Sequence, residues 1–200
     1  MWQRFDRFIG LDIHKQFLTI VILDSAQNVI FSLRKLSWRD FPAWARKHLT
    51  KRDAVVLEMT TNAYFVYDLI LPLAGQVRIA HPPSIHAKMD AGAKTDLRDG
   101  ESLARLLLQG EFEKDKGHVW APPLAVREIR TLVAIRYDLV GIRTESKNRL
   151  HAVLHRHLLD APEGSLPFSD KHAEFWQSLP GLSPCQRVEV RTHWNTMQYA

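Results

Sequence analysis

The chain has 200 residues, of which 46% are hydrophobic and 24% are charged, a balance typical of globular domains and not of disordered chains. Its formal net charge of +5 favours a polyanionic partner such as nucleic acid, without requiring one. The single cysteine, Cys185, excludes an internal disulfide, and no apolar run is long enough to span a membrane, so we expect a reducing, cytoplasmic setting.

Three strands are predicted near the N-terminus, at residues 7–14, 17–24 and 29–36. These runs are rich in Ile, Leu, Val and Thr, as buried strands are, and their short connections indicate an antiparallel meander. Ser37 is then expected to cap a helix, with Asp40 in the acidic position of a capping box.

The next elements alternate between strands and helices. Residues 54–59 and 76–80 are predicted strands, residues 62–75 and 95–109 are predicted helices, and residues 81–94 are a predicted loop. Three strands followed by helix, strand, helix, strand and helix is the order of the ribonuclease H-like (RuvC-like) fold, an α/β fold with a mixed sheet and flanking helices. In that fold the first and fourth strands are neighbours, and the third helix packs against them.

A linker at residues 110–123 leads to a long helical segment at residues 124–159. This segment carries seven Arg or Lys and three acidic residues, so it holds most of the net positive charge. Its apolar residues follow a three-four repeat that predicts a coiled-coil-like helix, although Ser146 and Arg149 interrupt it. The residues of the repeat are Leu132, Ile135, Leu139, Ile142, Leu150 and Val153.

Four carboxylates stand where the predicted topology would bring them together: Asp12, Glu58, Asp96 and Asp99. An acid within an apolar strand is costly unless it is paired, metal-bound or exposed, and two acids three apart on a helix share a face and repel. Four gathered carboxylates form a cage for hard divalent cations, Mg²⁺ or Mn²⁺. A pair of such ions can activate a water or hydroxyl and stabilise the leaving oxygen of a phosphodiester.

Simpler interpretations exist for each acid taken alone. Asp12 is a possible strand-end acid that faces water. Asp96 is a possible helix N-cap and Asp99 a first-turn acid favoured by the helix dipole. Glu58 is a possible partner of Arg78 or Lys94. The coincidence of all four acids with the topology favours the metal cage.

Basic residues near the acids and along the long helix are candidates for contact with nucleic-acid phosphates. Those flanking the acids are Lys94 and Arg98. Those on the helix are Arg136, Arg143, Lys147 and Arg149.

The segments "FIGLDIHKQFLTIVILD", "VVLEMT" and "KTDLRDG" resemble the motif blocks of the insertion sequence 110 family of transposases, the DEDD transposases with a RuvC-like N-terminal domain. Gly100 stands where the family usually has alanine. The resemblance places the family's acidic tetrad at Asp12, Glu58, Asp96 and Asp99, with Mg²⁺ or Mn²⁺ as the cofactor.

The resemblance implies a recombinase that mobilises a DNA element by metal-dependent strand cleavage and exchange. Its partners would be the element ends, the target DNA, a structured guide RNA and further copies of itself in a dimer or tetramer. The tetrad would cooperate with a serine nucleophile in a separate C-terminal domain. We therefore expect a prokaryotic, cytoplasmic protein associated with the nucleoid.

The expected organisation is a RuvC-like nuclease domain at residues 1–112, a linker and long basic helix at 113–160, and the start of the C-terminal domain at 161–200. The segment "SLPGLSP" resembles the opening of that domain, and we expect its serine to be missing. Two alternatives remain open: a RuvC-type junction resolvase, and a non-catalytic nucleic-acid-binding remnant or regulator that oligomerises through its long helix.

Overall fold

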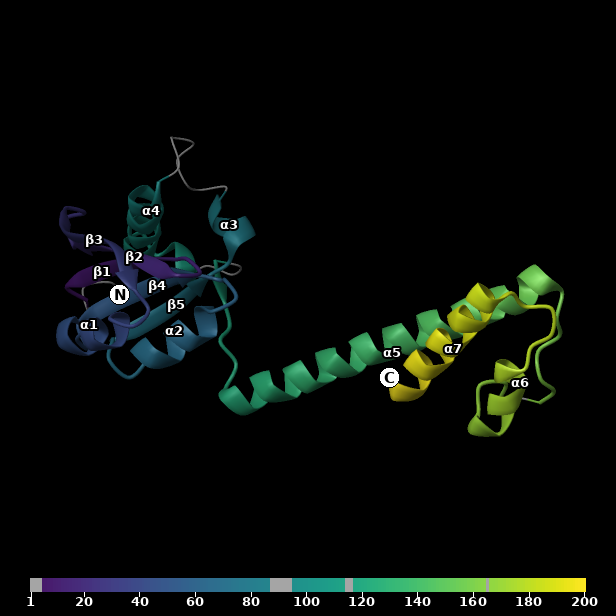
Figure 1. Ribbon diagram of the computed structural model, residues 1–200. Coiled ribbons are helices and arrows are strands. Elements are labelled where there is room, and N and C mark those ends of the chain that lie inside the picture. The colour runs from purple at the N-terminus through teal and green to yellow at the C-terminus, as the bar shows by residue number, and fades with distance from the viewer. Residues whose placement is uncertain (1–4, 87–94, 114–116, 165) are drawn as a thin grey trace. The chain divides into compact units, whose positions relative to one another are not determined.

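The chain divides into two compact units between residues 121 and 122. The computed structural model describes residues 5–86, 95–113, 117–164 and 166–200. The first unit is a sheet with flanking helices, and the second consists of helices (Figure 1). The three-part division predicted from the sequence stays a prediction.

A six-stranded mixed sheet of order β3-β2-β1-β4-β5-β6 forms the centre of the first unit. β1 pairs antiparallel with β2, and β2 with β3, whereas β1, β4 and β5 run parallel. The predicted meander and the predicted neighbouring of the first and fourth strands are therefore confirmed. The strands are β1 (Arg7–Ile13), β2 (Phe17–Asp24), β3 (Val29–Ser37), β4 (Asp53–Glu58), β5 (Gln76–Ala80) and β6 (His118–Val119).

Helices cover both faces of this sheet. Figure 1 shows α1 and α2 on one side and α4 on the other, and the buried residues form a separate apolar cluster on each side. The expected ribonuclease H-like α/β architecture is thereby confirmed. The helical elements are α1 (Phe41–His48), α2 (Ala63–Ile70), α3 (Pro82–His86), α4 (Asp96–Leu108) and the 3₁₀ helix η2 (Glu111–Glu113).

The expected start of the first helix is wrong by about one turn. Ser37 still belongs to β3, where it pairs with Phe17, and the helix begins at Phe41. The Ser37 hydroxyl donates to Asp40 Oδ2 over 2.7 Å and accepts from the Asp40 backbone N–H over 3.2 Å. The two side chains therefore close a turn ahead of the helix instead of capping it.

Two short elements lie in segments that the sequence analysis treats as loop and linker. α3 occupies part of the predicted loop, and its first turn is closed by the Ser84 backbone N–H donating to His81 O over 3.0 Å. β6 pairs antiparallel with β5 at the sheet edge. Elements of five and two residues are too short to show a hydrophobic period, so pattern reading misses them.

The second unit is built on the long predicted helix. Its helical elements are α5 (Leu124–His157), η3 (Asp170–His172), α6 (Ala173–Gln177) and α7 (Pro184–Tyr199). The tail after α5, weakly patterned in the sequence, supplies most of an apolar core that includes Trp176 and Trp194. Ser183 and Gln186 form a capping box at the start of α7.

Only the C-terminal third of α5 contributes to that core, through Leu150, Val153 and Leu154. The residues from 128 to 145 are all exposed, among them the first four members of the three-four repeat. None of the helices in the described ranges combines the length and the apolar character needed to cross a bilayer.

Candidate metal centre

Asp12 and Glu58 lie at the same end of two neighbouring strands. Because side chains alternate along a strand, Asp12 faces the same side as Phe8, which packs in the cluster beneath α4. On β4, Glu58 lies two residues after Val56 of that same cluster, so the two side chains share a face of the sheet. Leu11 pairs with Leu57 in the parallel ladder, so the two acids stand one step beyond this pair on the α4 face.

Gly10 allows α4 to lie directly on β1. A Cβ atom added to Gly10 would stand 1.9 Å from the carbonyl oxygen of Gly100 and 2.9 Å from the backbone nitrogen of Ala104. No residue but glycine fits at position 10 while the helix holds this position. The contact fixes the start of α4 beside the end of β1.

Thr95, and not Asp96, caps α4. Its backbone is extended, and its hydroxyl accepts the Arg98 backbone N–H over 3.4 Å. The alternative in which Asp96 is the cap is therefore wrong. Asp96 and Asp99 are first-turn acids, placed where the helix dipole favours negative charge.

His14 lies within reach of both the acid on β1 and an acid on α4. Its Nε2 atom lies 2.9 Å from Asp12 Oδ2 and 3.5 Å from Asp96 Oδ1. One ligand atom from each of these three residues falls within 4.8 Å of the others, and within the described ranges this group does not include Glu58 or Asp99. Sequence reasoning missed His14, although its position two residues after Asp12 on the same side of the chain was a usable signal.

The donor set fits a divalent ion. Ligands at adjacent octahedral positions, about 2.1 Å from the ion, lie about 3 Å apart, close to the two distances at His14 Nε2. Two carboxylates and an imidazole are common ligands of Mn²⁺ and of later divalent metals.

The electrostatics of the site are unfavourable to the Asp12 carboxylate without a cation. Asp12 is only 8% exposed, and burial raises the pKa of its carboxyl group. The charges of Asp99 and Asp96 raise this pKa further, whereas His14 lowers it. Both α4 acids therefore act on Asp12, and a bound cation would relieve the repulsion among the three.

The basic candidates around the acids are only partly placed by the structure. Lys94 lies outside the described residues. Arg98 is exposed in the first turn of α4. Arg78, considered as a partner of Glu58, forms an ion pair of 2.9 Å with Glu113.

The basic candidates of α5 differ in their surroundings. Arg136 and Arg143 are exposed and stand two helical turns apart, so they share a face. The Lys147 ammonium lies 5.6 Å from the centre of the Phe168 ring, and Arg149 forms a pair of 3.5 Å with an acid one turn earlier. The first two are thus the most available for contact with a partner.

Comparison with known proteins decides the family. The family profile of the insertion sequence 110 DEDD transposases, described as a transposase, matches residues 9–158. The chain belongs to this family. It is also similar to the protein named "Putative transposase y4qE" from Sinorhizobium fredii, with 27% identity over 161 residues that cover 76% of this chain. The matched region covers 39% of that relative, so the chain spans about two fifths of its length.

Membership in the transposase family confirms the resemblance stated from the sequence motifs. The matched range begins within β1 and ends just after α5, and it contains Asp12, Glu58, Asp96 and Asp99. The part played by each of the four acids stays a prediction.

Proposed function

We propose that the chain is the metal-dependent nuclease part of a transposase that cleaves and exchanges DNA strands. Asp12, Glu58, Asp96 and Asp99 would hold Mg²⁺ or Mn²⁺. The observation that carries this proposal is the group formed by the buried Asp12, His14 and the α4 residue Asp96, whose ligand atoms lie within 4.8 Å of one another. A buried carboxylate is costly unless it is paired or coordinates a metal.

We assign metal binding to the four acids and phosphate contact to Arg98. Asp12 and Glu58 would offer oxygen ligands from the rigid sheet, and Asp96 and Asp99 from the start of α4. A bound divalent ion supplies Lewis acidity toward a phosphodiester and lowers the pKa of a bound water. Arg98, exposed beside the acids, would pair with a phosphate of the DNA backbone.

The proposed partners follow from the family and from the basic surface of α5. We propose that the element ends, the target DNA and a structured guide RNA contact the exposed Arg136 and Arg143, with Lys147 and Arg149 nearby. A serine nucleophile in a separate C-terminal domain would cooperate with the tetrad. The nucleoid of the prokaryotic cytoplasm, where these DNA partners lie, is the proposed site of action.

Metal dependence is the deciding experiment. The chain, supplied with its guide RNA, DNA carrying the element ends and the separate C-terminal serine domain, should nick DNA in Mg²⁺ or Mn²⁺, lose this activity in EDTA and regain it when the metal is restored. Ca²⁺ serves as a control, since its larger and more flexible coordination shell suits binding better than this chemistry. Cleavage that persists in EDTA would contradict the proposal.

One observation favours a second candidate, a non-catalytic nucleic-acid-binding regulator that oligomerises through α5. The basic and apolar surface of α5 belongs to a different compact unit from the four acids. Such a protein would bind DNA or RNA with full affinity and produce no nicks under any metal condition.

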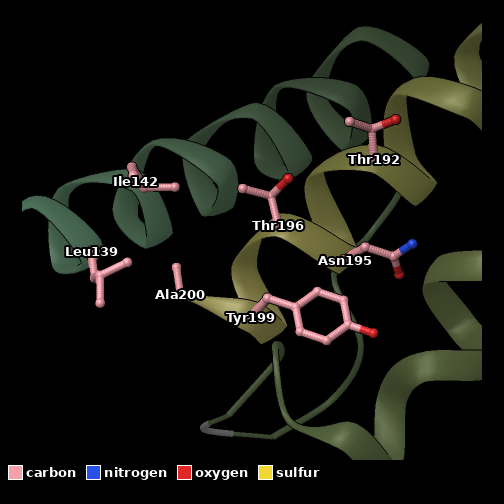
Figure 2. A pocket seen from close by; sticks show the side chains of 7 residues that line it. All are labelled: Leu139, Ile142, Thr192, Asn195, Thr196, Tyr199 and Ala200. Carbon is pink, nitrogen blue, oxygen red and sulfur yellow. The ribbon is translucent and has the colours of Figure 1, made fainter.

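The exposed part of α5 supports self-association. Leu132, Ile135, Leu139 and Ile142 lie on one face, with Leu132 67% exposed. Leu139 and Ile142 also line an open pocket of about 510 Å³ beside the end of α7 (Figure 2). A helix whose apolar face is exposed gains little stability from its own hydrogen bonds, so we propose that a second copy of α5 covers this face.

The double substitution Leu132→Glu with Leu139→Glu should therefore dissociate the oligomer. Each Leu loses about 2 kcal/mol of apolar burial and gains a charge, so the dissociation constant should rise at least a hundredfold, about 2.7 kcal/mol. Sedimentation equilibrium measures it. The matched control is Tyr137→Glu with Thr144→Glu, which also lie seven apart but on the opposite face of α5. Equal increases in the dissociation constant for both double variants would contradict the proposal that the Leu132 face forms the dimer contact.

A further inference from the structure

We propose that His14 Nε2 is a ligand of the same divalent ion as Asp12 and Asp96, and that this nitrogen makes the site prefer Mn²⁺ over Mg²⁺. The inference rests on the proposed function and deepens it, because an all-carboxylate cage would offer oxygen alone. Mg²⁺ favours oxygen ligands, whereas imidazole binds metals later in the first transition row more tightly.

The geometry already places the three donors around one point. His14 Nε2 is 2.9 Å from Asp12 Oδ2 and 3.5 Å from Asp96 Oδ1, and one donor atom from each residue falls within a 4.8 Å group. An ion seated among them would take the place of the His14–Asp12 contact. The imidazole would then coordinate in its neutral form, with the proton on Nδ1.

The surroundings hold the imidazole in this orientation. The His14 backbone N–H donates to Phe17 O over 2.9 Å, which closes the tight turn between β1 and β2. The rings of His14 and Phe17 lie with their centres 4.6 Å apart. The indole N–H of Trp38 donates to His14 O and to Lys15 O, over 3.2 and 3.1 Å. A ligand fixed by its neighbours binds metal with a smaller loss of entropy.

A buried hydroxyl beside Asp12 points to the same place independently. Thr19 lies opposite Asp12 in the β1–β2 ladder, so its side chain is on the same face of the sheet, and it is fully buried. Within the described part of the chain its Oγ1 atom has no hydrogen-bond partner. Buried hydroxyls are normally satisfied, and a water bound to an ion at this site would satisfy Thr19.

Mn²⁺ is the probe that tests the proposal, and electron paramagnetic resonance on the full chain is the measurement. Loss of the free Mn²⁺ signal gives the affinity and the number of sites, and electron spin echo modulation reports a directly bound ¹⁴N. The wild-type chain should bind Mn²⁺ with one ¹⁴N coupling and at least ten times more tightly than Mg²⁺, measured by competition.

The variant His14→Gln should lose the ¹⁴N coupling and bind Mn²⁺ about tenfold more weakly, with a smaller change for Mg²⁺. The exposed His155 provides a matched control, because His155→Gln removes an imidazole from the other compact unit. It should leave both affinities and the coupling unchanged.

The outcomes separate this inference from the proposed function. Tight Mn²⁺ binding without a ¹⁴N coupling in the wild type overturns the role of His14 and leaves a carboxylate site. The absence of tight binding overturns the metal centre as a whole. A ¹⁴N-coupled site in a chain that never cleaves DNA supports His14 as a ligand and contradicts the proposed nuclease.

Discussion

Replacing Gly10 with alanine should separate α4 from the sheet and abolish divalent-ion binding. The added methyl group would lie 1.9 Å from Gly100 O and 2.9 Å from Ala104 N. These are backbone atoms, so no side-chain rotation relieves the clash and the whole helix must move. Because α4 carries Asp96 and Asp99, the displacement removes half of the proposed tetrad from Asp12.

The free energy of unfolding of Gly10→Ala should fall by about 3 kcal/mol or more, at the upper end of overpacking effects because the obstacle is backbone. Chemical denaturation followed by circular dichroism measures this loss, and Mn²⁺ titration measures the loss of the site. A stable Gly10→Ala variant with unchanged Mn²⁺ affinity would contradict the proposed role of the α4–β1 contact.

Two further glycines provide matched controls. The added Cβ of Gly100→Ala would lie 3.1 Å from Val21 Cγ2, a side-chain atom that can shift by a few tenths of an ångström. Alanine also improves the helix propensity by about 1 kcal/mol, so the net change should stay within about 1 kcal/mol. Gly141→Ala on α5 meets no atom within 4 Å and should stabilise that helix slightly.

The sheet and the three principal helices of the first unit could be predicted because their hydrophobic patterns are regular and extend over many residues. Strands such as Phe17–Asp24 are continuous β-branched and apolar runs, and the order of elements then fixed which strands are neighbours. The start of α1 could not be predicted in this way. Ser37 and Asp40 have the spacing of a capping box, but pairing with Phe17 keeps Ser37 in the strand.

The candidate site was predictable only as a set of acids on particular elements. An aspartate that interrupts an apolar strand, as Asp12 does, is visible in the sequence because burial of charge is costly. The contribution of His14 depends on the turn after β1, which Trp38 and Phe17 hold through contacts distant in sequence. The role of Gly10 is likewise invisible without the helix above it, since a glycine in a strand has several explanations.

Asp12→Asn should separate the stability of the fold from its proposed function. Asparagine has the shape of aspartate and its side-chain oxygen can still accept from His14 Nε2, but it carries no charge. In the wild type, burial and the charges of Asp99 and Asp96 raise the pKa of Asp12 in the folded state, despite the opposing effect of His14. Ionisation of Asp12 therefore costs folding free energy.

The sign of the pH dependence follows from this raised pKa. Below the ordinary aspartate pKa of about 3.9 the group is protonated in both states and costs nothing. As the pH rises through the folded-state value, the wild type loses stability that Asp12→Asn keeps. Without metal at pH 7 the variant should be at least as stable as the wild type, and its advantage should shrink as the pH falls toward 4.

In the presence of divalent ions the wild type should be more stable than Asp12→Asn. At a concentration one hundred times the dissociation constant, an ion that binds only the folded state adds about 2.7 kcal/mol, which the wild type should gain and Asp12→Asn should not. DNA cleavage should fall more than about a hundredfold in the variant, since loss of groups that merely support a metal ligand already costs 10–100-fold. Thermal unfolding with and without Mn²⁺, at several pH values, measures the first effect.

Asp24, the half-buried last residue of β2, offers a control for Asp12→Asn. Its carboxylate accepts the backbone N–H groups of Ala26 and Asn28, and these bonds lower its pKa. Asp24→Asn should therefore lose some stability at pH 7 and keep the full gain from Mn²⁺, the opposite of Asp12→Asn on both counts. If both variants lose stability without metal and both keep the Mn²⁺ gain, Asp12 is a structural residue and the metal lies elsewhere.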